Sequence, residues 1–107
     1  MSQIVTLINA ATAAATGPTF SSLQDGQLDV DARTFQATVV GTGAVTATVT
    51  VSVSNDNTNW LTLGVITLSG TTSATDGFAS NAPWAYVRAA TGTPTGTGAT
   101  VTAKMAY

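Results

Sequence analysis

Two aspartates and an arginine form the group whose spacing could support acid–base or metal chemistry. Asp29 and Asp31 are two residues apart and Arg33 continues the spacing, so in an extended strand the three side chains share one face. Paired carboxylates in such an arrangement serve glycosidases and calcium sites. We interpret the group instead as a local charge ladder, in which Arg33 offsets the two aspartates.

The remaining inventory of side chains excludes most catalytic chemistry. The 107-residue chain contains no histidine and no cysteine, so it lacks the commonest general base and the strongest nucleophile. A zinc ion would find only carboxylates and carbonyls as ligands, and no disulfide can form. We therefore expect no catalytic residue, no metal site and no cofactor, and we predict that the protein is not an enzyme.

The segment 55–59, NDNTN, resembles a calcium-binding loop only superficially. Asp56 is its only charged residue, and the chain contains no glutamate to act as a bidentate ligand. Asn and Asp side chains accept hydrogen bonds from nearby backbone N–H groups and tolerate left-handed conformations, so we predict a polar turn. Trp60, which follows directly, is predicted to lie in the core because large aromatic side chains are usually buried.

A second candidate site is the stretch WAYVRAA, residues 84–90. Trp84, Tyr86 and Arg88 alternate with small apolar residues, so the three lie on one face of a strand. If the small residues face the core, the three form an exposed aromatic–arginine stripe with the composition of a binding hot spot. If the faces are reversed, Trp84 and Tyr86 fill the core.

The elements that must position these residues are all strands. Gly, Pro and Asx residues interrupt the chain every ~8–12 residues, a spacing typical of a β-sandwich or barrel. The clearest strand is 45–54, VTATVTVSVS, in which valine and alanine alternate strictly with threonine and serine. Turns are expected at 41–43 (GTG) and at Asp76-Gly77. The expected strands are 3–8, 19–23, 27–31, 33–40, 45–54, 60–69, 84–90 and 99–107.

The strand 60–69 has an irregular pattern. Leu61 and Leu63 lie on one parity, whereas Ile66 and Leu68 lie on the other, with Gly64 between them. A β-bulge or bend near Gly64 would place both pairs in the core.

These patterns predict an all-β fold in a single domain, residues 1–107. We expect an antiparallel β-sandwich of seven to eight strands, with jelly-roll or immunoglobulin-like topology. Residues 1–20 allow two interpretations. They form either an arm lying on a neighbouring subunit, anchored by Ile4, Val5, Leu7 and Ile8, or the first strand of the same sandwich.

Charge is unusually scarce and argues against two classes of partner. Charged residues make up 7% of the chain, and Lys+Arg 3 against Asp+Glu 5 gives a net charge of −2. Three scattered cations cannot neutralise a phosphate backbone or hold an anionic membrane surface. We expect neither nucleic acid nor membrane as a partner. No basic, apolar leader opens the sequence, so we expect a protein made soluble in its host's cytoplasm.

Residues 33–107 resemble a recurrent pattern in small virion structural proteins of tailed bacteriophages. The pattern has a valine-rich strand, a Ser-Asn/Asp-Asp turn and a Trp, then an aromatic–x–Tyr–Val–Arg strand and a Gly-Thr-Gly turn. Asn57 departs from it, since Gly is more usual there, but Asn also suits a turn. The matching residues are Ser54, Asn55, Asp56, Trp60, Pro83, Trp84, Tyr86, Val87, Arg88, Gly96, Gly98 and Val101.

The resemblance implies a capsid decoration (cement) protein, and with it a location and partners. Proteins of this kind are usually trimeric jelly-roll-like sandwiches that bind the outer capsid lattice and reinforce it. The implied partners are the major capsid protein and further copies of this chain, on the capsid surface of the virion. Two alternatives are a tail or neck component and a carbohydrate-binding module of a tail or fibre. In that module Trp84, Tyr86 and Trp60 would stack on sugars.

Overall fold

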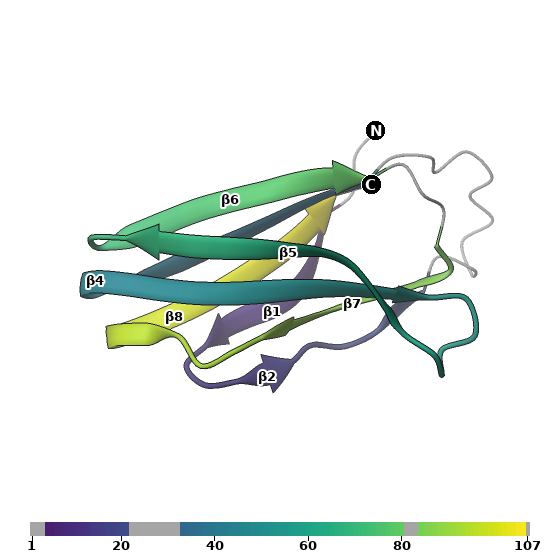
Figure 1. Ribbon diagram of the computed structural model, residues 1–107, viewed down its shortest axis with the longest axis horizontal. Helices are drawn as coiled ribbons and strands as arrows, with labels where there is room; N and C mark the ends of the chain where they lie inside the picture. The colour runs from purple at the N-terminus through teal and green to yellow at the C-terminus, as the bar shows by residue number, and fades with distance from the viewer. Residues whose placement is uncertain (1–3, 22–32, 81–83, 107) are drawn as a thin grey trace.

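The computed structural model describes residues 4–21, 33–80 and 84–106, and the described residues form eight strands without a helix (Figure 1). All ladders between them are antiparallel. The predicted all-β antiparallel fold with seven to eight strands is therefore confirmed. The strands are β1 (Ile4–Ala11), β2 (Ala15–Thr16), β3 (Phe20–Ser21), β4 (Arg33–Ser54), β5 (Leu61–Gly70), β6 (Ser73–Ser80), β7 (Tyr86–Thr91) and β8 (Thr95–Ala106).

One long strand, β4, joins the two halves of the fold. Its first part, residues 33–42, pairs with β6 on one side and β8 on the other, and β8 pairs in turn with β1. Its second part, residues 45–54, pairs with β5 and β7, and β7 pairs with β2 and β3. The sheet thus folds over itself into a first half, β6–β4–β8–β1, and a second half, β5–β4–β7–β2/β3.

The bend between the two halves lies where the sequence predicted a turn. Residues 41–43 do not end the strand, because β4 runs without interruption from Arg33 to Ser54. Instead, the register against β8 shifts between Val40 and Thr42 and again before Thr46. Bulges of this kind bend a strand while its pairing continues. The Gly-Thr-Gly segment therefore redirects the strand and does not reverse the chain.

The core lies between the two halves and is built by strict alternation along β4. The apolar residues predicted to share one face of strand 45–54 are all buried, with Val49 fully enclosed at 0% exposure. Burying each valine or larger apolar side chain contributes about 1.5–3 kcal/mol. The opposite, hydroxyl-bearing face is exposed or half-buried, except for Ser54, which is buried.

The predicted irregularity in β5 is present, but its consequence for packing is different. The register against β4 shifts between the pairs Val51–Gly64 and Ser52–Thr62, so Leu63 is the extra residue of a bulge. Leu63 packs against the core, whereas Leu61 remains 57% exposed. The prediction that the bulge places both pairs of residues in the core is therefore wrong for Leu61, whereas Ile66 and Leu68 are buried.

The predicted turn at Asp76-Gly77 is also wrong, because both residues lie inside β6. The chain reverses earlier, between Gly70 and Ser73. A Cβ atom at position 77 would lie 2.1 Å from the carbonyl oxygen of Phe35 on the neighbouring strand. Glycine is therefore required here for close approach of two backbones, a role that looks the same as a turn signal in the sequence.

The first described residues belong to the same domain. β1 pairs with β8, and its Leu7 and Ile8 are buried in the core at 1% and 4% exposure. Beyond β1, the N–H of Gly17 donates to the carbonyl of Ala89 at 2.8 Å. Of the two interpretations of this segment, the structure therefore matches the first strand of the sandwich.

Candidate functional site

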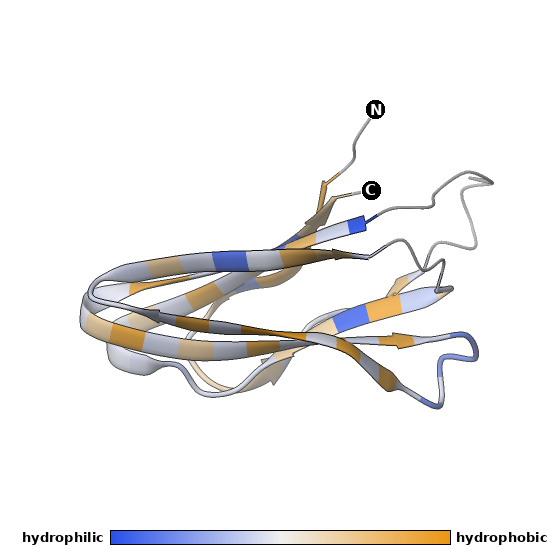
Figure 2. Ribbon diagram, turned by 45° about the horizontal axis from the view of Figure 1, so that its top comes forward, coloured by the Kyte–Doolittle hydropathy of each residue, from blue (hydrophilic) through white to orange (hydrophobic). Residues whose placement is uncertain are grey.

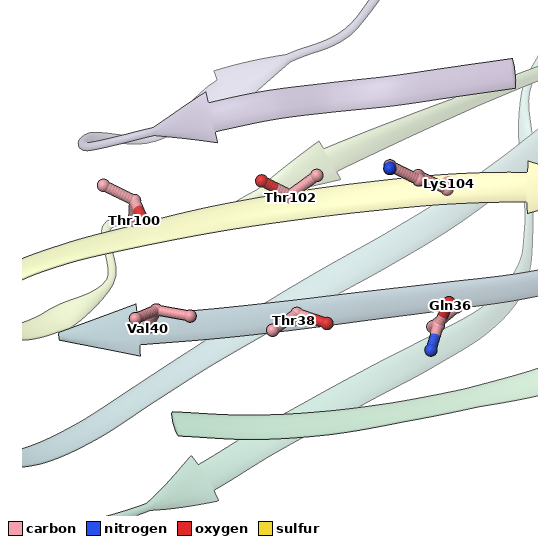
Figure 3. A pocket seen from close by; sticks show the side chains of 6 residues that line it. All are labelled: Gln36, Thr38, Val40, Thr100, Thr102 and Lys104. Carbon is pink, nitrogen blue, oxygen red and sulfur yellow. The ribbon is translucent and has the colours of Figure 1, made fainter. Parts of the chain in front are cut away.

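The outer face of the first half carries a shallow depression between β4 and β8. The depression has a volume of about 270 Å³, and its lining side chains come from alternate positions of the two strands (Figure 3). Four of the six are threonine or valine, Gln36 is neutral, and Lys104 is the only charged one. The lining residues are Gln36, Thr38, Val40, Thr100, Thr102 and Lys104.

Several threonine hydroxyls on the outer surface bond to neighbouring strands. Thr38 and Thr75 share a hydrogen bond of 3.0 Å between their Oγ1 atoms. The hydroxyl of Thr102 accepts a bond from the N–H of Ala10 at 3.2 Å, and the hydroxyls of Thr46 and Thr95 also pair. Polar atoms satisfied in this way can be covered by a neighbouring protein at low desolvation cost. The face is polar without being ionic.

The outer face of the second half has the same character. Along β4 it presents Thr46, Thr48, Thr50 and Ser52, which are exposed or half-buried. The cross-strand neighbour of Thr50 on β5 is Val65, 52% exposed. Figure 2 shows how few strand positions are strongly hydrophilic, in contrast to the polar loop between β4 and β5.

Trp60 lies at the edge of this second face and not in the core. The guanidinium carbon of Arg88 stands 4.1 Å from the centroid of the Trp60 ring, a cation–π contact. Both side chains are half-buried. The prediction that Trp60 is a core residue is wrong, because the core space under β4 is filled by valine and alanine. The sequence carried no signal for this contact, since the two residues lie 28 positions apart.

Trp84, Tyr86 and Arg88 do not follow either sequence interpretation as a group, and all three are half-buried. The alternate residues Val87 and Ala89 are fully buried, so Tyr86 and Arg88 point away from the core. Trp84 is half-buried, packs against the core, and precedes the strand. The structure thus keeps Tyr86 and Arg88 partly accessible on the outer face, whereas Trp84 contacts the core.

Arg33 is buried at 4% exposure, and its Nη1 atom donates to the carbonyl oxygen of Trp84 at 3.0 Å. This contact joins the start of β4 to the segment that leads into β7. The aspartates with which Arg33 was grouped, Asp29 and Asp31, lie outside the described residues, as does the strand expected at 27–31.

The predicted polar turn at 55–59 is organised by Asp56. One carboxylate oxygen of Asp56 accepts from the hydroxyl of Ser54 and from the N–H groups of Thr58 and Asn59, all within 2.9 Å. The other accepts from the amide nitrogen of Asn59 at 2.8 Å. Asn57 adopts a left-handed conformation with φ 57°. Because both oxygens accept hydrogen bonds from within the turn, Asp56 acts as its structural cap.

The four residues proposed as anchors of an arm have separate locations. Leu7 and Ile8 are buried in the chain's own core, Val5 is half-buried against it, and Ile4 is 70% exposed. Of the four, Ile4 is therefore the one most available to a neighbour. The other large apolar side chains with half or more of their surface exposed are Val40, Leu61 and Val65.

Within residues 4–21, 33–80 and 84–106, no group of three or more acidic residues, histidines or cysteines gathers as a metal site. The same residues contain no helix long and apolar enough to span a bilayer. What the described surface offers is contact area: hydroxyl-lined, nearly uncharged sheet faces with single apolar side chains on them.

The fold is shared with solved structures of other proteins, one of them prophage-derived. The SPBc2 prophage-derived protein YomS superposes with a TM-score of 0.64 at 16% sequence identity, over 99% of this chain and 91% of that one. The PBSX exported protein XepA gives a TM-score of 0.58 at 13% identity, over 99% of this chain and 36% of that one. This chain thus spans about a third of XepA. No protein-family model matches the sequence, and no curated protein sequence matches it.

Proposed function

We propose that this chain is a structural protein of a bacteriophage particle, and specifically a capsid decoration protein that assembles as a homotrimer on the outer capsid lattice. The observation that carries the proposal is the character of the two outer sheet faces. Among the described residues, each presents threonine, serine and single aliphatic side chains, together with Lys104 on the first face and the half-buried Arg88 on the second. Such surfaces can be covered by neighbouring subunits without leaving charges unpaired.

The fold supports the same proposal. YomS is a prophage-derived protein, and it has this architecture over nearly its whole length. The motifs of residues 33–107 that resemble phage virion proteins lie at structural positions in this fold, such as the Asp56 turn.

A carbohydrate-binding module is the less favoured alternative. Sugar recognition by stacking needs an open aromatic face, and the guanidinium of Arg88 covers one face of Trp60. Trp84 packs partly against the core. Two of the three candidate platforms are therefore already engaged in contacts within the chain.

The test is co-sedimentation of the purified protein with expanded, DNA-free capsids of the phage that encodes it, combined with mass measurement in solution. We expect a trimer that binds capsids at saturable stoichiometry. Val40→Asp and Val65→Asp each place a charge on one outer face, and at least one should weaken binding about tenfold or more, since an unpaired buried charge is costly. Thr93→Asp adds the same charge to an exposed loop and is the matched control.

A monomer that binds no capsid would contradict the proposal. Retention on host polysaccharide, lost in Tyr86→Ala, would favour the carbohydrate-binding alternative. Incorporation into tails but not into capsids would favour a tail or neck component.

A further inference from the structure

Arg88 is an unusual residue on a surface with so little charge. Its neighbours across β4 are neutral: Ser52 pairs with it directly, and Thr62 lies beyond Ser52 on β5. Apart from its contact with Trp60, Arg88 makes no hydrogen bond or ion pair with any residue of 4–21, 33–80 or 84–106. It is therefore a cation on a neutral face, without a partner in the described part of its own chain.

The contact with Trp60 fixes the guanidinium group in place. A guanidinium that already lies over an indole ring loses less side-chain entropy when it binds an anion, and a guanidinium can donate two parallel bonds to a carboxylate. Ser52 and Tyr86 add hydroxyl groups on the same face of the sheet. This is the arrangement of a preformed receptor for a carboxylate.

The described residues contain two acids that could match it on a second copy. Both oxygens of Asp56 are engaged within its own turn. Asp76 differs: it is exposed in the middle of β6, which pairs with β4 alone among the described strands. One of its oxygens accepts from the N–H of Gly77 at 2.8 Å, and no bond to the other is found among the described residues.

The positions of the two residues suit a head-to-tail contact. Asp76 lies on β6, at the edge of the first half, whereas Arg88 lies on β7, on the other side of β4 in the second half. Contact between two different patches is what a cyclic trimer requires, because each subunit presents one patch to each neighbour. A charge in the middle of an edge strand also opposes pairing of that edge with a strand of a second copy. We therefore expect the two copies to contact each other through side chains.

We propose that the Arg88 guanidinium, held on Trp60, binds the Asp76 carboxylate of a second copy and so forms the charged anchor of the homo-oligomer. The inference rests on the homo-oligomer of the proposed function, and it names the pair of residues that selects the contact. The remainder of the interface would be neutral, so this pair would set its register.

The test is a charge-reversal cycle, read out as the concentration at which the oligomer dissociates. Arg88→Asp and Asp76→Arg should each raise that concentration by about tenfold or more, and the double variant should recover most of the loss. Trp60→Leu keeps the charge but removes the stacking, and should weaken association by a smaller factor. Thr93→Asp and Thr93→Arg place a charge of either sign on the exposed loop between β7 and β8 and should leave association unchanged. Far-UV circular dichroism of every variant verifies that it folds.

Five outcomes would overturn the inference. Failure of the double variant to recover, or equal weakening by Thr93→Asp, would show that the effect comes from net charge and not from this pair. An unchanged trimer in Arg88→Asp would remove Arg88 from the subunit contact while leaving the proposed function intact. A trimer that loses only capsid binding would assign the carboxylate to the capsid. A wild-type monomer would contradict the oligomer itself, and with it this pair.

Discussion

At the scale of single residues, the carboxylate of Asp56 accepts four hydrogen bonds from its own turn. The hydrogen bond from the N–H of Asn59 lowers the pKa of this carboxyl most. The side chain of Asn59, the N–H of Thr58 and the hydroxyl of Ser54 follow in that order. Together they hold the pKa of the Asp56 carboxyl well below its usual range. One ionised side chain thus accepts the hydrogen bonds that fix the conformation of the turn between β4 and β5.

The lowered pKa of Asp56 predicts a specific dependence of stability on pH. Since the folded state favours the ionised form, the stabilisation is fully present above the ordinary aspartate pKa of about 3.9 and is lost as the pH falls below it. Asp56→Asn should therefore lower the free energy of unfolding at pH 7, and the deficit relative to wild type should shrink toward pH 2. Urea unfolding at several pH values measures both.

Asn57→Gly is the control for this measurement, because it keeps the left-handed conformation at position 57 and leaves every bond to Asp56 in place. It should retain the pH dependence of the wild type. A deficit of Asp56→Asn that is the same at pH 7 and pH 2 would show that the carboxylate does not act through its charge.

At the scale of elements, Phe78 fills the space where the two halves meet along β5 and β6. Its ring stacks on Phe35 with centroids 5.0 Å apart and an interplanar angle of 28°. The same ring lies against Gly64, where an added Cβ would come within 2.6 Å of it. The bulge in β5 thus places a residue without a side chain opposite an aromatic ring.

We expect Gly64→Ala to destabilise the protein by about 1–3 kcal/mol, because the new methyl group must displace a packed ring. Phe78→Leu shortens the opposing side chain, so adding it to Gly64→Ala should recover part of that loss. Chemical denaturation of the two single variants and the double variant measures the coupling.

Gly92→Ala is the matched control, since a Cβ at position 92 meets no atom within 4 Å. It should change stability by less than about 0.5 kcal/mol. Equal costs at positions 64 and 92 would mean that Phe78 is not what restricts position 64.

At the scale of the whole molecule, the two halves are expected to unfold together because β4 belongs to both. Val39 lies in its first part and Val51 in its second, and both are buried at 1% exposure or less. Because β4 is continuous, we expect that unfolding of its first part also disrupts the pairing of its second part, and the reverse. The molecule is therefore expected to behave as one cooperative unit.

Val39→Ala and Val51→Ala should each lower the free energy of unfolding by about 2–3 kcal/mol, through lost burial and a residual cavity. Tryptophan fluorescence and far-UV circular dichroism should give coincident transitions in both variants at a fixed protein concentration. Thr48→Ala, on the exposed face of the same strand, should be close to neutral. Separate transitions for the two probes would show that the halves unfold independently.

The sequence alone determined the strand faces and the polar turn. Alternation from Val45 to Val53 has a period of two, and that period leaves one arrangement in which the valines are buried and the threonines are not. The Asn and Asp residues of 55–59 act on backbone atoms within three positions, so their role is also local. Both features could be predicted because their causes lie within one segment.

Only the tertiary structure decided which faces and residues meet. It placed Arg88 on Trp60, brought Thr38 beside Thr102, turned Leu7 and Ile8 into the core, and kept Asp76-Gly77 inside a strand. These contacts join residues far apart in the chain, and they depend on strand order and register, which no local pattern encodes. For that reason the nearly uncharged outer faces could be expected from composition. The pairing of Arg88 with Asp76 that we propose between two copies could not.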